Sequence, residues 1–284
     1  LGPGAIFNPG RIAGPAISTI ERDWLDSARA IPEEEWSGYT HLLRGSEIYF
    51  NQWNAPETWG RAMPYFETAV ARAAASQARA RRDSMRAHLA IWPGQDDYND
   101  VHAAFMASCD RTLAADPTEP NVRRMMATGY LHTGRISAAH WHFARGLRDT
   151  PNDPHLNITF SRYLTHIGQP RRALAVARRA QQLKPLHPDC FWEQIGLALY
   201  ALERYDEALA ALRRVRSPSY YEHLYVAACQ IGLEHGTAAA QSIERVLADM
   251  SDLRLSAMDR LLPYQDQTLR RRLHRHLRAA GLPR

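Results

Sequence analysis

The sequence contains little cysteine, and its cysteines form no pattern. Cys109, Cys190 and Cys229 are the three cysteines among 284 residues, and no two of them stand in a Cys-x-x-Cys pair. An odd and widely spaced set of thiols excludes the disulfide framework that stabilises many small secreted domains. We therefore expect small, buried thiols in a reducing compartment, and we predict a cytoplasmic protein.

Long apolar runs are also missing, because no stretch of 18 or more apolar residues occurs. This excludes a predicted transmembrane helix. The opening "LGPGAIFNPG" has neither a charged region nor an apolar core, so we expect no signal peptide there. The sequence starts without methionine, and we expect either a processed chain or the C-terminal part of a longer one.

Lysine is nearly absent, since Lys184 is the only one, whereas arginine and alanine are abundant. The formal net charge of +5 raises the question of nucleic-acid binding. Arginine together with alanine is typical of GC-rich coding, however, and acidic residues are interspersed along most of the chain. The composition therefore favours a coding bias over a nucleic-acid partner.

The motifs of common enzymes are missing as well. The sequence has no Gly-x-Ser-x-Gly elbow, no His-Glu-x-x-His, no P-loop and no dinucleotide-binding glycine pattern. His140 and His142 are two positions apart on a predicted helix, so their side chains point about 200° apart and cannot easily share a metal ion. We expect a protein without catalytic residues, cofactor or metal.

A repeated unit runs from Pro120 to about Val215, with a period of about 34 residues. At that period Gly134 aligns with Gly168, while Ala139 aligns with Ala173. Glycine suits the left-handed turn that ends a helix, and alanine lets two helices approach closely. In the third copy, a large residue, a small one, an aromatic and an alanine recur as Trp192, Gly196, Tyr205 and Ala208. The pattern is that of tetratricopeptide repeats.

These repeats predict an all-α, right-handed superhelical solenoid. We place an irregular segment at residues 1–15 and the helical repeat domain at 16–284, with the clearest units at 120–153, 154–187 and 189–222. The final helix has Leu269, Leu273 and Leu277 on one stripe. A solenoid needs such a capping helix to cover the apolar face of its last repeat.

In tetratricopeptide arrays, the first helices of the pairs line a concave groove. Counting along the repeats predicts a mixed groove of charged, polar and apolar side chains, which suits another protein or an extended peptide. The predicted partner-binding residues are Asn121, Arg124, Thr128, His155, Arg162, Glu193, Leu197 and Tyr200. We expect Arg124 and Arg162 to bind acidic groups, and Leu197 and Tyr200 to supply apolar contacts.

Three segments resemble a more specific family. They are the segment that ends in Leu43, Arg44 and Gly45, the central repeats at 150–215, and the ending "LLPYQDQTLRRRLHRHLRAAGLPR". They resemble the C-terminal region of bacterial regulators in which an adenylate cyclase or winged-helix domain precedes a TolB-like segment and tetratricopeptide repeats. The resemblance implies a regulatory interaction module whose partner is a linked cyclase or DNA-binding domain. It supplies no catalytic residue.

Other functions stay open at this point. A polyanion binder would use the arginines between Arg79 and Arg86 together with those of the last helix, and its affinity would fall steeply with salt. An accessory or enzymatic protein would hold a small ligand in the groove. A structural spacer would leave the groove unused.

Overall fold

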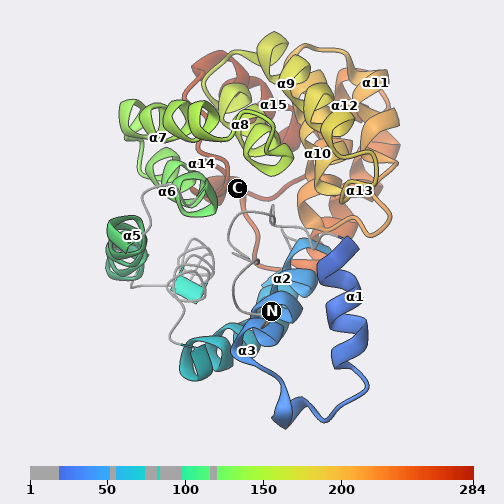
Figure 1. Ribbon diagram of the computed structural model, residues 1–284. Helices are drawn as coiled ribbons and strands as arrows, with labels where there is room; N and C mark the ends of the chain where they lie inside the picture. Colours follow the sequence, from blue (N-terminus) through green and yellow to red (C-terminus); the bar gives the residue numbers. More distant parts are fainter. Residues whose placement is uncertain (1–18, 52–55, 74–81, 84–97, 116–119) are drawn as a thin grey trace.

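The computed structural model describes residues 19–51, 56–73, 82–83, 98–115 and 120–284 (Figure 1). The described residues form helices and no β-strand, which confirms the all-α prediction. The predicted irregular segment at residues 1–15 lies outside them. Within them, no helix combines the length and apolarity that crossing a membrane requires.

In the described part of the chain, five helical elements precede the clearest repeats. They are α1 (Thr19–Ala28), the 3-10 helix η2 (Glu33–Glu35), α2 (Gly38–Asn51), α3 (Pro56–Ala73) and α5 (Tyr98–Ala115). Four helix pairs follow: α6 (Pro120–His132) with α7 (Ile136–Asp149), α8 (Pro154–His166) with α9 (Pro170–Leu183), α10 (Cys190–Ala201) with α11 (Tyr205–Leu212), and α12 (Tyr220–Gly232) with α13 (Gly236–Asp249). The chain then forms η3 (Leu255–Ala257), α14 (Met258–Leu261) and α15 (Gln267–Ala279).

The turn inside each helix pair contains one residue with a left-handed backbone. In the first two pairs this residue is Gly134, with φ of 71°, and Gly168, with φ of 79°, as the repeat predicted. The third and fourth pairs place Glu203 and Glu234 there, at φ of 62° and 63°. A glutamate at positive φ is less favourable than glycine. The turn geometry is therefore kept where the glycine signal is lost.

Side chains at the helix starts satisfy backbone N–H groups that have no partner within the helix. The Asp153 carboxylate accepts from the N–H groups of His155 and Leu156 at 2.8 and 2.9 Å. At α12, Ser219 and Glu222 form a capping box. The Glu222 carboxylate accepts from the backbone N–H of Ser219, and the Ser219 hydroxyl oxygen accepts from a backbone N–H of the first turn. These local signals fix where α8 and α12 begin.

Small residues set how closely the two helices of a pair approach. Ala139, Ala173, Ala208 and Ala239 occupy the same place on the second helices, and all four are fully buried. On α10, a Cβ atom at Gly196 would lie 2.7 Å from Cγ of Leu212 on α11. Larger side chains at these positions would force the helices apart.

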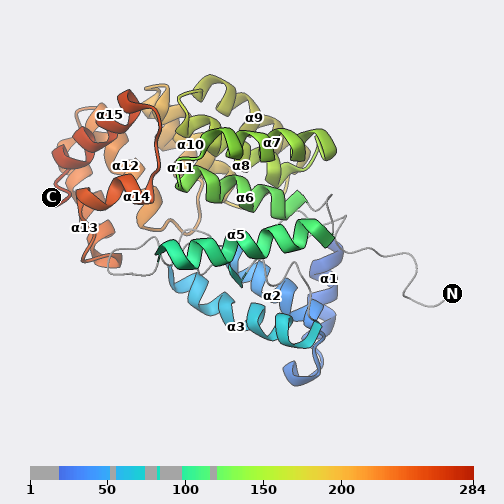
Figure 2. The ribbon, with the colours of Figure 1, turned by 90° about the vertical axis from the view of Figure 1, so that its left-hand side faces the viewer.

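The helix pairs follow one another around a curve (Figure 1). Helices α6, α8 and α10 lie on its inner side, and α7, α9 and α11 lie on its outer side. Helices α1–α3 lie across from α8 and α9 (Figures 1 and 2). One cluster of buried apolar side chains extends from Leu42 and Phe66 through the repeats to Leu277. A second, smaller cluster lies between α5 and α6, around Phe105 and Met126.

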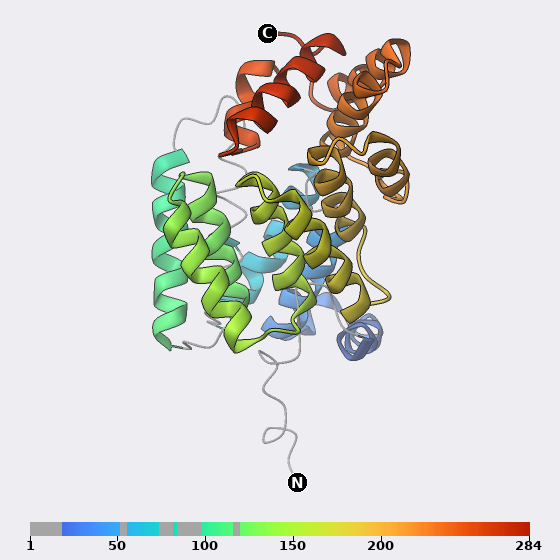
Figure 3. The same cartoon turned by 90° about the horizontal axis from the view of Figure 1, so that it is seen from above.

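The C-terminal helices lie at the α12–α13 end of the curve, where Figures 2 and 3 show them in red beside the orange pair. The leucine stripe of α15 is buried, and α15 packs against α12. The backbone N–H of Leu255 donates to the carbonyl of Pro283 at 2.7 Å, which ties the end of the chain to η3. The predicted capping helix is therefore present, and it makes further contacts described below.

Candidate functional site

The eight predicted partner-binding residues all lie on the first helices α6, α8 and α10, whose shared surface we call the inner face. Six of them are at most 7% exposed: Asn121, Arg124, His155, Glu193, Leu197 and Tyr200. Only Thr128 and Arg162 are partly exposed. The prediction assumed an open groove, whereas six of these eight side chains are buried.

A charged cluster lies at the centre of the inner face. The Arg162 guanidinium lies 5.5 Å from the centre of the Tyr221 ring, and the Glu193 carboxylate contributes to the field that keeps it charged. Glu193 is completely buried and accepts a hydrogen bond of 2.6 Å from the Gln194 amide. Removing a charge from water destabilises the folded state unless other charges or hydrogen bonds compensate it, so this cluster lowers the stability of a packed solenoid.

Glu222 of α12 extends the charged cluster to the fourth pair. Its Oε2 accepts from both the backbone N–H and the hydroxyl of Ser219, at 2.7 Å each. Burial raises the pKa of the Glu222 carboxyl above its ordinary value, although the hydrogen bonds from Ser219 oppose the shift. Sequence reasoning missed Glu222, because it belongs to a segment with a loose fit to the repeat.

Cys190 of α10 and His155 of α8 lie in another part of the inner face. Burial raises the pKa of the Cys190 thiol well above its usual range, and Glu193 adds to the shift. The ring of His155 meets the edge of Phe191 at 5.4 Å between centres, and its Nε2 lies 3.3 Å from Nζ of Lys184. The only lysine of the sequence is thus held at the edge of the inner face.

The C-terminal helix closes the inner face at Tyr200. The buried Arg272 of α15 donates to the carbonyl of Ala201 at 2.7 Å and to that of Tyr200 at 3.3 Å. A cation at the C-terminal end of α10 is favoured by the helix dipole and satisfies carbonyls that lack partners in the helix. His276 Nδ1 lies 3.3 Å from the Tyr200 hydroxyl and 2.9 Å from the carbonyl of Ala228.

The segment before α15 reaches back to α8. The Tyr264 ring stacks on the His166 ring with 4.4 Å between their centres and 12° between their planes. The backbone N–H of Gln265 donates to the His166 carbonyl at 2.8 Å, and the hydroxyls of Tyr264 and Tyr225 lie 2.5 Å apart. The C-terminal segment therefore contacts α8, α10 and α12, which is more than the predicted cap on the last pair.

The chemistry available to the other proposed functions is limited in the described part of the chain. No group of three or more His, Cys, Asp or Glu side chains there could hold a metal ion. Arg79, Arg81 and Arg86 lie outside the described residues, whereas Arg82 pairs with Asp83 at 2.8 Å. Among the terminal arginines, Arg270 pairs with Asp259 and Arg272 is buried, which leaves Arg271, Arg275 and Arg278 exposed.

No protein-family model matches the chain, and no curated protein sequence matches it. Solved structures do resemble it. A tetratricopeptide-repeat protein of Thermus thermophilus superposes with a TM-score of 0.52 at 18% identity, covering 72% of this chain and 99% of that one.

Two further solved structures resemble this chain over different shares of their own length. PilW, a type IV pilus biogenesis factor, has a TM-score of 0.52 at 14% identity over 70% of this chain and 92% of its own. The hetero-tetramer Cut9–Hcn1 of the anaphase-promoting complex gives a TM-score of 0.59 at 14% identity, over 89% of this chain and 47% of the matched one. At these identities the likeness shows the fold alone, which is a solenoid of the tetratricopeptide type.

Proposed function

We propose that the chain is a non-catalytic protein-interaction scaffold whose partner binds the inner face. The charged cluster of Arg162, Glu193 and Glu222 supports this proposal most strongly. A helical solenoid reaches its stability through apolar contacts, and buried charges usually cost several kcal/mol before they are compensated. Placing both signs of charge on one face gives that face selectivity for a complementary partner.

Access to the inner face is part of the proposal. We call the arrangement seen in the structure, with the C-terminal segment packed on α8 and α10, the closed arrangement. In it Thr128 and Arg162 are partly exposed to a partner, while Arg124, Glu193 and Tyr200 are buried. The partner therefore competes with the chain's own residues, and binding is coupled to a local opening of the solenoid. Such opening lowers the apparent affinity by the fraction of chains that are open, so it sets how readily the partner binds.

We place this scaffold in a cytoplasmic, bacterial signalling protein. The Leu43-Arg44-Gly45 segment and the ending with Pro263, Tyr264 and Asp266 carry the resemblance to cyclase and winged-helix regulators. In that setting the partner is a linked or associated regulatory domain. Tyr264 and Asp266 also serve the closed arrangement, because Tyr264 stacks on His166 and Asp266 caps α15.

The experiment is a comparison of captured proteins. The tagged full chain and its Arg124→Gln/Arg162→Gln variant are incubated with lysate of the source cells, and bound proteins are quantified by mass spectrometry. A matched Arg213→Gln/Arg278→Gln variant removes two exposed arginines away from the inner face. We expect a partner that the wild type and the matched variant retain and the inner-face variant loses. Equal retention by all three, with equal circular dichroism, would contradict the proposal.

A second candidate, polyanion binding, is favoured by the outer face of α9. Four exposed arginines lie there, and none forms an ion pair within the described residues: Arg171, Arg172, Arg178 and Arg179. Such a stripe would contact phosphates and release counterions. Titration of fluorescent double-stranded DNA at increasing salt concentration tests this second candidate. An affinity that does not fall with salt would exclude phosphate binding by these arginines.

A further inference from the structure

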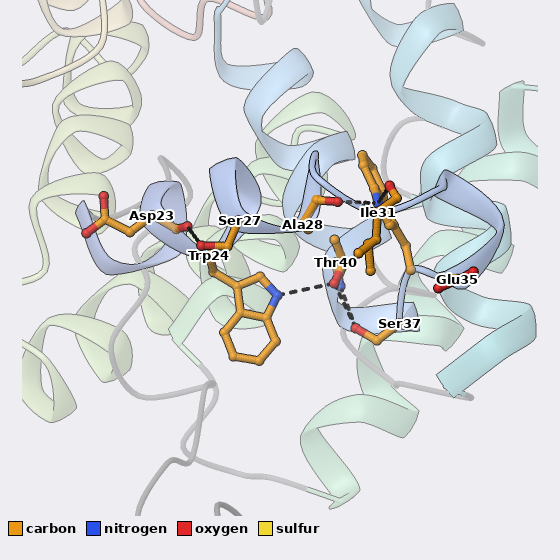
Figure 4. A pocket seen from close by; sticks show the side chains of 9 residues that line it. Asp23, Trp24, Ser27, Ala28, Ile31, Glu35, Ser37 and Thr40 are labelled. Carbon is orange, nitrogen blue, oxygen red and sulfur yellow. Dashed lines mark hydrogen bonds between the residues drawn. The ribbon is translucent and has the colours of Figure 1, made fainter.

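Residues of α1, η2, α2 and the turns between them line an open pocket of about 600 Å³ (Figure 4). No residue of the inner face lines it. Figure 4 shows Asp23 and Trp24 at one end and Ile31 and Glu35 at the other, with Ser37 and Thr40 between them. A pocket of this size is in the range that holds a small ligand or a few side chains of a peptide.

The walls of the pocket are held in place by hydrogen bonds. The buried Trp36 donates its indole N–H to the carbonyl of Ala28 at 2.9 Å, which fixes the chain between α1 and η2. The Trp24 indole N–H donates to the Thr40 hydroxyl at 3.2 Å, and its ring meets the edge of Tyr39 at 6.0 Å. The pocket is therefore preformed, which lowers the entropy cost of binding.

Large apolar side chains are exposed in this pocket. Trp24 is 52% exposed and Ile31 is 45% exposed, and both line the pocket. Tryptophan in a fixed orientation is the residue that most often dominates the energy of a protein interface. An exposed apolar pocket of this kind indicates an interaction site.

The rim of the pocket is acidic in a chain whose net charge is positive. Asp23 and Glu35 line it, and Glu33 and Glu34 directly precede Glu35. None of these four carboxylates forms an ion pair within the described residues. Two arginines lie nearby: Arg29 pairs with Asp26 and Glu47, and Arg72 donates to the backbone carbonyls of Glu34 and Trp36. Neither forms an ion pair with Asp23 or Glu35 within the described residues.

We propose that this pocket binds a basic peptide segment of another protein, in which arginines or lysines flank one or two bulky apolar side chains. The apolar side chains would lie between Trp24 and Ile31, and the cations would face Asp23 and Glu35. We choose a basic partner on the ground of charge complementarity, because an acidic rim repels acidic segments and attracts basic ones.

The basic helices of a second copy fit the pocket less well. The leucines of α15 are buried in its own core, and the large apolar side chain beside the exposed arginines of α9, Leu183, is only 36% exposed. The proposal does not depend on the inner face, since no residue of α6, α8 or α10 lines this pocket. The chain would then have two docking surfaces of different chemistry.

Fluorescence anisotropy with two synthetic peptides tests the proposal. One peptide has arginines on both sides of a leucine pair, and the other has glutamates in their place. We expect the full chain to bind the arginine peptide and not the glutamate peptide. The variants Ile31→Ser and Asp23→Arg/Glu35→Arg should each weaken binding about tenfold or more, whereas Trp141→Ala, at an exposed tryptophan on α7, should not.

Several results would overturn the proposal. The arginine peptide could fail to bind, or it could bind the Asp23→Arg/Glu35→Arg variant as tightly as the wild type. Sedimentation equilibrium tests whether a second copy occupies the pocket. Self-association that Ile31→Ser abolishes would assign the pocket to a second copy, with the exposed Leu186 as its candidate anchor. Circular dichroism of each variant separates a lost contact from a lost fold.

Discussion

His166 makes the stability of the closed arrangement depend on pH. Its ring is completely buried at the end of α8, with Nδ1 2.8 Å from the carbonyl of Arg162 and one face against Tyr264. Nδ1 therefore carries the proton, and Nε2 has no hydrogen-bond partner among the described residues. Burial, together with the Arg162 guanidinium, lowers the pKa of His166 from 6.5 to about 3.

The direction of the effect follows from proton binding. Above pH 6.5 the imidazole is neutral in both states, so it adds no pH dependence; as the pH falls from 6.5 toward 3, only the unfolded chain gains the proton. At about pH 5 the free energy of unfolding falls by about 2 kcal/mol through this one residue.

Urea unfolding at about pH 7.5 and about pH 5, followed by circular dichroism, measures the effect. His166→Phe keeps a ring against Tyr264 and removes the titrating group. Between the two pH values, the free energy of unfolding of this variant should therefore fall by about 2 kcal/mol less than that of the wild type. His140→Phe, at an exposed position on α7, should follow the wild type. Other buried histidines, such as His276, act in the same direction, and the comparison of variants separates His166 from them. Parallel losses in the wild type and His166→Phe would refute the reasoning.

Three further changes have defined outcomes. Gly196→Ala should destabilise the chain by about 1–3 kcal/mol, because its Cβ would clash with Leu212. Arg272→Met should cost about 1.5–3 kcal/mol in urea unfolding, because it removes charged hydrogen bonds to the end of α10. The Cys190 thiol should react with a maleimide more slowly in the native than in the urea-unfolded chain, by a factor on the order of 100.

Each of these changes has a matched control in the chain. Gly60→Ala on α3 meets nothing within 4 Å, so it should stabilise the helix by about 0.5–1 kcal/mol. The exposed Arg278→Met should change stability by about 0.5 kcal/mol or less. Cys229, buried on α12, should react more slowly than Cys190 if the inner face opens by itself. Equal rates for the two thiols would show that access requires global unfolding.

The helices and turns of the repeats were predictable because their causes are local. Gly134 and Gly168 mark left-handed turns, and the buried alanines such as Ala173 mark close helix contacts, so a fixed spacing carries both signals. Pro154 and Pro170 begin helices at positions where a proline needs no N–H partner. The predicted all-α solenoid is confirmed for these reasons.

The covering of the inner face could not be predicted, because it depends on contacts between residues far apart in the sequence. Arg272 lies 72 positions from Tyr200, whose carbonyl it binds, and no spacing rule connects them. Tyr264 stood out as part of the terminal motif, but only the structure shows its ring on His166. The pocket beside Trp24 likewise forms only when α1, η2 and α2 fold together.

Hydrogen exchange of the full chain shows whether a partner binds the inner face. The exchange of each helix is measured with and without a partner retained in the capture experiment. We expect the partner to change exchange on α6, α8 and α10 and in the C-terminal segment at Tyr264 and Arg272, which covers part of that face. Changes confined to the outer helices α7, α9 and α11 would contradict this expectation, because they would place the partner on the opposite surface.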